Sequence, residues 1–150
     1  MTLIVGTDTY VTLAEADEYF ASSLKADDWD ALSDATKEIL LKSAVRRMEG
    51  KPYLGTKQVE SQALEFPRYF DNAIFDGTPD DIKSAQCEIA LSLYQNQDNK
   101  ILQAKAMGLT SISLGNQSYS LNTQASGDII INQDAQYHLN QWTRKGGIIA

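Results

Sequence analysis

The sequence predicts a mainly α protein, a compact bundle of three to four helices with an extended strap and a small β-hairpin arm. In three stretches of the first two-thirds of the chain, apolar residues recur at helical spacing behind a residue that suits a helix start. A segment without helical periodicity, Tyr53–Phe70, which we call the strap, separates the second stretch from the third. Beyond residue 106 the composition changes to Ser, Thr, Asn and Gln. We therefore expect a helical core over 1–106, a β-hairpin arm over 107–132, and a C-terminal helix with a tail over 133–150.

The composition is that of a soluble globular protein. The chain has 150 residues, of which 43% are hydrophobic and 22% charged, and this length suits one domain. No apolar run approaches the roughly 20 residues that a membrane span requires, so we expect no membrane segment. The N-terminus carries no basic and apolar signal pattern, which favours synthesis in a cytosol. Cys87 is the single cysteine, which excludes an intrachain disulfide.

The negative charge lies at one end of the sequence. The net charge is -7, and residues 1–38 hold 9 acids and 2 bases against 11 acids and 11 bases in the remainder. A nucleic-acid binder needs clustered Lys and Arg to displace counterions, so this balance disfavours tight, autonomous DNA binding. If many copies lined a channel, however, their negative walls would repel phosphates and let DNA pass without sticking.

The first helix is predicted by a capping box. The Thr12 hydroxyl can accept from an early backbone amide while Glu15 reaches back to the cap residue. Its apolar stripe is Leu13, Ala16, Phe20 and Leu24. Acidic residues on the other faces are expected to be solvated.

The acidic stretch Asp27–Asp30 is interpreted as a turn, with Trp29 folded back as a core anchor. A calcium loop is the alternative. Counted from Asp28, its sixth position is Ser33 rather than Gly and its twelfth is Ile39 rather than Glu, so the spacing excludes an EF-hand loop.

A second helix is expected after Ser33, its N-cap, and should end near Gly50. Its core-facing residues are Leu40, Leu41, Ala44, Val45 and Met48. Three cations lie together on this helix, namely Lys42, Arg46 and Arg47. They could bind phosphate, or they could neutralise neighbouring acids within or between subunits.

The strap should lie extended across the helices, with Leu64 and Phe66 inserted into the core, because Phe66 precedes a proline. A third helix is predicted with Thr78 as N-cap and Pro79 in its first position. Its buried stripe is Ile82, Ala85, Ile89 and Leu93. Cys87 is expected to be a small buried group rather than a nucleophile.

The C-terminal third predicts a hairpin and a short helix. Gly115–Asn116 is a plausible two-residue turn, which would place Ile112 opposite Tyr119. Ile129–Ile131 could form a further short strand, and a last helix is expected around Ala135, Leu139 and Trp142.

Catalytic and cofactor chemistry is not indicated. The sequence has no Gly-rich phosphate loop and no paired Cys or His at metal-ligand spacing, so we expect neither an enzyme nor a cofactor. Base stacking on single-stranded nucleic acid requires exposed aromatic residues interleaved with basic ones. The run Arg68-Tyr69-Phe70 comes nearest to that description.

Three blocks of the chain resemble a known family. They are YVTLAEADEYF at 10–20, QALEFPR at 62–68 and PDDIKSAQCEIAL at 79–91. The Leu-Glu-Phe-Pro-Arg motif of the strap, followed by a helix that starts with proline, is the most specific of them. Together the blocks resemble the small helical head-tail connector (adaptor) family of tailed bacteriophages. Related phage sequences are also often described as similar to a primosomal single-stranded-DNA-binding protein, DnaT, which is the alternative interpretation.

The resemblance implies a structural role with no active site. It implies a homo-oligomeric ring, often dodecameric, between the portal protein and the next head-completion or tail protein. Genomic DNA would pass through its channel without specific binding. Such a protein is made in the host cytoplasm and resides in the virion at the head–tail junction.

The resemblance also suggests site residues. A C-terminal segment docks on the portal in such proteins, and the candidates here are Tyr137, Leu139, Trp142, Arg144, Lys145, Ile148 and Ile149. The alternative is that this last helix packs on the chain's own core. The candidate channel-lining acids are Glu15, Asp17 and Glu18.

Overall fold

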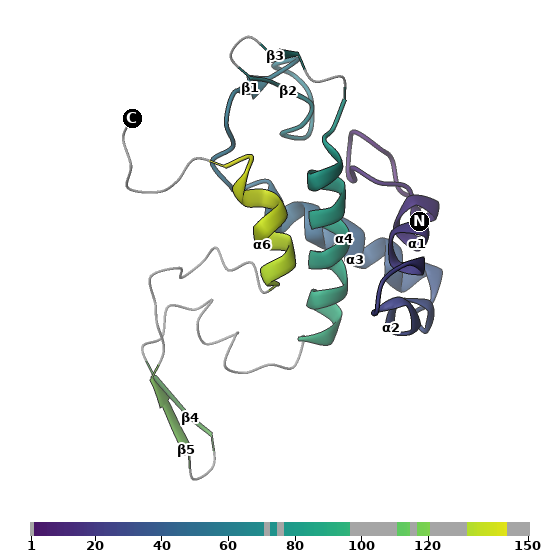
Figure 1. Ribbon diagram of the computed structural model, residues 1–150, viewed down its shortest axis with the longest axis vertical. Coiled ribbons are helices and arrows are strands. Elements are labelled where there is room, and N and C mark those ends of the chain that lie inside the picture. The colour runs from purple at the N-terminus through teal and green to yellow at the C-terminus, as the bar shows by residue number, and fades with distance from the viewer. Residues whose placement is uncertain are drawn as a thin grey trace.

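The computed structural model describes residues 2–70, 73–74, 77–96, 111–114, 117–120 and 132–143, and only the backbone of 73–74, 111–114 and 117–120. Its helices are α1 (Leu13–Ala21), α2 (Ala26–Asp30), α3 (Asp34–Met48), α4 (Asp80–Gln95) and α6 (Gln133–Asn140). Its strands are β1 (Thr56–Lys57), β2 (Arg68–Phe70), β3 (Ala73–Ile74), β4 (Ser111–Leu114) and β5 (Gln117–Ser120). The predicted fold class, mainly helical with a strap and a hairpin, is confirmed (Figure 1). None of the described helices is long and apolar enough to cross a membrane.

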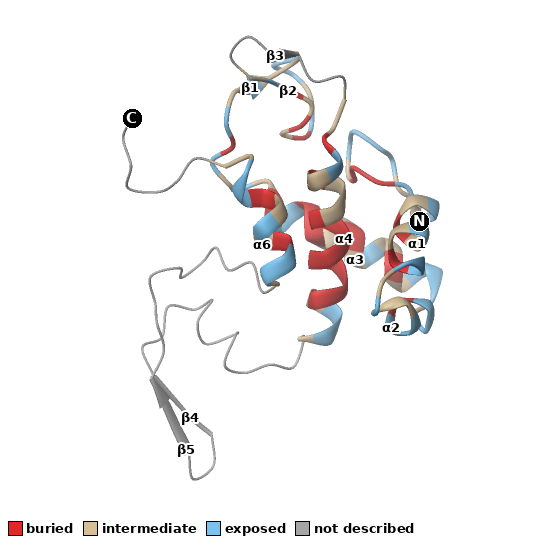
Figure 2. Cartoon of the chain, in the orientation of Figure 1, coloured by how far each residue is buried: buried red, intermediate tan, exposed pale blue. Residues whose placement is uncertain are grey.

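Helix α4 is the centre of the bundle. It packs against α3 on one side and α6 on another, and α1 also contacts it. Figure 2 shows its middle turns as the most continuously buried stretch of helix. Its buried apolar residues include Ile82, Ile89 and Leu91. Full burial of a large apolar side chain stabilises the folded state by about 1.5 to 3 kcal/mol, so the packing around α4 contributes strongly to stability.

A buried glutamine joins α4 to two other segments. The Gln86 side chain is wholly buried, and its Oε1 accepts from the Tyr10 amide at 2.9 Å. Its Nε2 donates to the Leu41 carbonyl at 3.1 Å and to the Thr9 hydroxyl at 2.8 Å. Because a buried amide without partners is unfavourable, these bonds fix how the N-terminal segment lies between α3 and α4.

The N-terminal helices follow the sequence in part. The capping box is present, with Glu15 N to Thr12 Oγ1 at 3.0 Å and Thr12 N to Glu15 Oε1 at 3.1 Å. Trp29 is buried and stacks on Phe20 at 4.6 Å between ring centroids, which confirms it as a core anchor. The expected turn around it is instead the short helix α2. Leu24 is fully exposed rather than part of the stripe, because α1 already ends at Ala21.

The start of α4 corrects the predicted cap. Pro79 is the N-cap residue, with ψ of 147°, and no side chain caps the helix. Thr78 is therefore one residue too early to be the N-cap. Asp80 and Asp81 occupy the first turn, where their negative charges interact favourably with the positive end of the helix dipole. The pattern thus located the helix but misplaced its cap by one residue.

Two small antiparallel sheets complete the described structure. The strap contains β1 and β2, paired in register Thr56↔Tyr69, with β3 on the other edge of β2. Leu64 and Phe66 of the strap are buried, as predicted. In the hairpin β4–β5, Ile112 pairs with Tyr119, which confirms the predicted register.

The hairpin lies apart from the helices (Figure 1). The turn predicted at Gly115–Asn116 and the strand predicted at Ile129–Ile131 lie outside the described residues. The division into three parts at residues 106 and 132 stays a prediction.

Candidate functional site: the strap and the groove beside it

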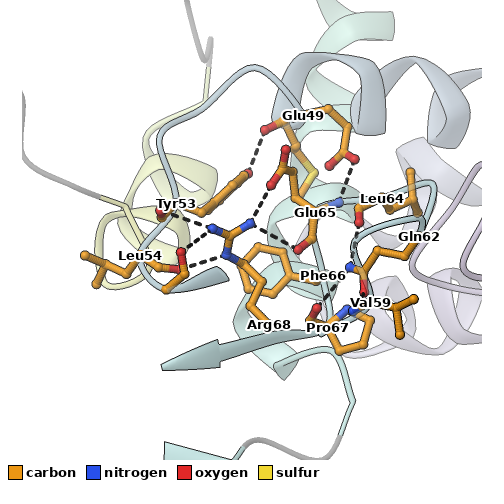
Figure 3. Close-up of polar contacts among 12 residues, drawn as sticks. Glu49, Tyr53, Leu54, Val59, Gln62, Leu64, Glu65, Phe66, Pro67 and Arg68 are labelled. Carbon is orange, nitrogen blue, oxygen red and sulfur yellow. Dashed lines mark hydrogen bonds and ion pairs between the residues drawn. The ribbon is translucent and has the colours of Figure 1, made fainter. Parts of the chain in front are cut away.

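The carboxylate of Glu49 fastens the strap to the helices. Glu49 is the C-cap residue of α3. Its Oε2 accepts from the Tyr10 hydroxyl at 2.6 Å. Its Oε1 accepts from the Glu65 amide at 2.9 Å (Figure 3). One side chain therefore joins the N-terminal segment, α3 and the strap. Burial raises the pKa of Glu49 above its ordinary value, although both hydrogen bonds favour the charged form.

Arg68 holds the two ends of the strap together. Its side chain is only 8% exposed. The Nε donates to the Leu54 carbonyl and an Nη to the Gly55 carbonyl, both at 2.7 Å, and the other Nη pairs with the Glu65 carboxylate (Figure 3). The donors of the guanidinium are thus bonded to groups of the protein itself.

These contacts settle the one stacking candidate that the sequence offered. Of the run Arg68-Tyr69-Phe70, only Tyr69 is well exposed, at 47%, while Arg68 is buried. Because its donors are bonded to backbone carbonyls, the buried Arg68 cannot also pair with a phosphate. The run is therefore a structural part of the strap and not an aromatic and basic platform for nucleic acid.

Gln62 shapes the turn of the strap. Its Oε1 accepts from the Val59 amide at 3.0 Å, and its Nε2 donates to the carbonyls of Leu64 at 2.7 Å and Pro67 at 3.0 Å. The side-chain amide thus gives a hydrogen-bond partner to the backbone of Val59 and Leu64, and it adds a second donor to the Pro67 carbonyl, which also accepts from the Gln58 amide at 3.2 Å. The Leu-Glu-Phe-Pro-Arg motif is thus embedded in a network that fixes its shape.

A groove of about 440 Å³ opens between the strap, α3 and the N-terminal turn. Its apolar floor is formed by Val45, Ala63 and Leu64. Its polar wall is formed by Thr7, Asp8, Lys42, Arg46, Glu49, Lys57 and Glu65. This volume lies within the range of about 300 to 1,000 Å³ that is usual for small-molecule sites.

The charges of the groove are only partly balanced. Lys42 pairs with Asp8 at 3.4 Å, and Glu65 pairs with Arg68. Arg46, which is exposed, and Lys57, which is half-buried, form no ion pair with another described residue. Two cations therefore remain available at this groove, opposed by the hydrogen-bonded carboxylate of Glu49.

The candidate channel-lining acids divide into two environments. Glu15 belongs to the capping box and pairs with Lys83 at 3.2 Å, and the Thr12 amide lowers the pKa of its carboxyl group. Asp17 points toward α2 and α3, where it accepts from Trp29 Nε1 at 2.8 Å and Lys37 at 3.0 Å. Glu18 is exposed, and its carboxylate has no such partner among the described residues.

A second hollow, of about 460 Å³, lies between α1 and α4. Glu15 and Glu18 line it together with Asp80 and Lys83, whereas Asp17 does not. Cys87 lies at its inner side, and burial raises the pKa of this thiol to about 12, which leaves it uncharged at neutral pH. Cys87 is thus the small buried group that the sequence predicted.

The candidate docking residues differ in how far they are exposed. Tyr137 is 69% exposed, while Leu139 is wholly buried against the chain's own core. Trp142 contacts Phe66 at 6.4 Å and donates to Asp81 at 3.2 Å. While α6 stays packed on α4, Leu139 is not available to a partner. The other four candidates, Arg144, Lys145, Ile148 and Ile149, lie outside the described residues.

Sequence reasoning missed Glu49 and Lys57. Neither carries a local signal, since Glu49 follows a helix end and Lys57 stands in a polar stretch. Among the described residues no group of His, Cys, Asp and Glu is placed to hold a metal ion.

The comparisons with known proteins bear on the family. No curated protein and no solved structure matches the chain. A sequence-family model described as "Putative DnaT-like ssDNA binding protein" matches residues 1–127. The match includes the strap and the groove and stops before α6. It agrees with the alternative interpretation of the sequence, and no comparison supports a head-tail connector. The chain belongs to this DnaT-like single-stranded-DNA-binding protein family.

Proposed function

We propose that the protein binds single-stranded DNA as an accessory protein without catalytic activity of its own. The observation that carries this proposal is the family match over residues 1–127. The described surface adds three cations without an ion pair, Arg46 and Arg47 on α3 and Lys57 on β1.

The binding should be weak and tolerant of sequence. Most cations of the described residues already pair with the chain's own acids, namely Lys25, Lys37, Lys42, Arg68 and Lys83. Among the described residues Arg46, Arg47 and Lys57 form no ion pair, and together they can contribute at most about -2 to the slope of log K against log salt. Large aromatic side chains such as Tyr10, Trp29 and Phe66 are buried, so base stacking contributes little.

Fluorescence anisotropy of a labelled oligo-dT, titrated with the protein at several salt concentrations, tests this proposal. We expect micromolar or weaker binding that declines with salt at this shallow slope. If the anisotropy stays flat at the lowest salt concentration, the protein does not bind single-stranded DNA and the proposal is wrong.

A second candidate is the head-tail connector of a tailed phage, and the charge distribution favours it. Residues 1–38 carry 9 acids and 2 bases, and Glu18 presents an unpaired carboxylate on the surface of α1 among the described residues. As a homo-oligomeric ring below the portal protein, the chain would line a DNA channel with negative charge and bind DNA little. Tyr137 on α6 and the residues after 143 would contact the portal, and the next head-completion or tail protein would bind the far side.

Mass photometry of the purified protein, with and without the portal from the same genome and at two salt concentrations, tests the second candidate. Ring-sized particles that form on the portal, together with flat anisotropy, would establish the connector. Persistent monomer in the presence of portal would exclude it.

A further inference from the structure

We infer that the groove between α3 and the strap is an anion site that holds one phosphodiester group between Arg46 and Lys57. This inference rests on the proposed binding of single-stranded DNA, because it names where and how the strand is held. The groove combines a polar wall with an apolar floor, which suits a phosphate with its sugar.

The two cations reach the groove from different parts of the chain. Arg46 comes from the last full turn of α3 and Lys57 from β1 of the strap. Arg68 holds the residues just before β1 in place through the carbonyls of Leu54 and Gly55. Lys57 is also near enough to Glu49 to stabilise its charged form. The anion would therefore sit beside the Glu49 carboxylate, with the Thr7 hydroxyl on the same wall.

The charges of the groove fit a monoanion. The pairs Asp8–Lys42 and Glu65–Arg68 cancel. Two positive charges, Arg46 and Lys57, then face the single negative charge of Glu49. A net charge of one positive unit matches the single charge of a phosphodiester, so the site is better suited to the backbone of a strand than to a dianion.

Glu49 limits the affinity of the site. The charged groups that face it are Lys57 of β1 and Glu65 of the strap, with the Tyr10 hydroxyl bonded to it and Asp8, Lys42 and Arg46 along the same groove. Because burial raises its pKa, acidification neutralises Glu49 earlier than an ordinary glutamate. Binding should therefore tighten on mild acidification.

The test compares two adjacent arginines. Arg46 and Arg47 are both exposed in the last turn of α3, and Arg47 does not line the groove. R46Q and R47Q thus remove the same charge from the same helix end. In the oligo-dT titration, R46Q and K57Q should each weaken binding about tenfold. Each should also make the salt slope shallower, by up to about 0.7, which is the share of the one phosphate that the two cations hold together.

The matched variants should behave differently. R47Q should leave the salt slope unchanged, and E49Q should tighten binding at neutral pH and abolish its pH dependence. Circular dichroism checks that each variant is folded. If R46Q and R47Q weaken binding equally, or if E49Q has no effect, the attraction is diffuse and the groove site is wrong, although the proposed function stands.

A second experiment distinguishes the phosphate of a DNA strand from free inorganic phosphate. Two-dimensional NMR of the wild type follows the resonances of Arg46 and Lys57 during titration with oligo-dT and, separately, with inorganic phosphate. Shifts with both support the site. Shifts with inorganic phosphate alone retain the anion site but exclude DNA as its ligand. Shifts with neither overturn the site.

Discussion

Glu15 on α1 and Glu49 beside the strap each accept a hydrogen bond from a backbone amide, yet their pKa values move in opposite directions. Glu15 lies at the surface, where the Thr12 amide dominates and lowers its pKa. Glu49 lies between three segments, where burial dominates and raises its pKa. The comparison shows that a hydrogen bond decides the direction of the pKa shift for the carboxylate at the exposed helix end, while desolvation decides it for the carboxylate where distant segments meet.

The ion pairs of the two regions differ in the same way. Lys83–Glu15 joins side chains that are 34% and 42% exposed, so water screens the pair. Arg68–Glu65 joins side chains that are 8% and 27% exposed, and the same guanidinium also satisfies backbone carbonyls. We therefore expect the strap to carry far more of the stability than the surface of α1.

Replacement of Arg68 should have the largest effect. R68A leaves Glu65 and the carbonyls of Leu54 and Gly55 without their donor, and should lower the free energy of unfolding by about 3 to 5 kcal/mol. Urea unfolding measures it. R68K should recover little, because an ammonium group cannot reproduce the planar fork. K83A is the matched surface pair and should lose less than about 1 kcal/mol. Equal losses for R68A and K83A would contradict the contrast between the regions.

A methyl group at Gly55 should have the next largest effect. Gly55 has φ of +75°, and a Cβ there would lie 1.9 Å from the Tyr69 carbonyl oxygen, so β1 and β2 would have to separate. G55A should lower the free energy of unfolding by about 3 kcal/mol, from the strained backbone together with the clash. Gly6 has φ of +87° with nothing within 4 Å, and G6A should lose only about 1 kcal/mol. Thermal unfolding of both variants isolates the clash, and similar melting temperatures would exclude it.

Removal of the α1 cap should have a smaller effect. T12A deletes the hydroxyl that accepts from the Glu15 amide and should lower the free energy of unfolding by about 1 kcal/mol. T12S retains the hydroxyl and should stay close to the wild type in urea unfolding. A loss as large as that of R68A would show that α1 depends on its cap as strongly as the strap depends on Arg68.

The pH dependence of stability should give the smallest effect. The raised pKa of Glu49 favours its protonated form in the folded state, so its contribution is full below the ordinary value of 4.5 and is lost as pH rises through the folded pKa. The lowered pKa of Glu15 acts in the opposite sense, since its contribution is present above 4.5 and is lost as pH falls through the folded pKa.

Urea unfolding between about pH 7 and pH 5 measures the difference. The wild type should gain stability from Glu49 as the pH falls through this range, and E49Q should lack that gain, while E15Q should retain it. A wild type and an E49Q variant with parallel pH profiles would show that Glu49 is not the group responsible.

Much of the fold followed from local patterns. The capping box of α1, the burial of Leu64 and Phe66 and the pairing of Ile112 with Tyr119 each depend on residues within a few positions of one another. The pattern was wrong by one residue at the start of α4. Thr78 was predicted as the N-cap and Pro79 as the first helical residue, but Pro79 has the extended ψ of 147° and is itself the N-cap.

The candidate site was only half visible in the sequence. Lys42, Arg46 and Arg47 stood out as a cluster on one helix, with phosphate binding and neutralisation both open. The structure gives a different answer for each, since Lys42 pairs with Asp8, Arg46 lines the groove and Arg47 does not. Arg68, which looked like a surface cation, is buried because the strap folds around it.

The sequence by itself determined the starts of α1 and α3, the extended strap, the hairpin register and the acidic N-terminal quarter. These depend on hydrogen bonds and apolar spacing over short stretches of chain. Only the tertiary structure decided which charged side chains form ion pairs within the chain and which stay available to a ligand. A groove whose wall draws on residues 7, 46, 57 and 65 exists only once those segments meet, because burial and pairing of a charge depend on what packs against it and not on its neighbours in the chain.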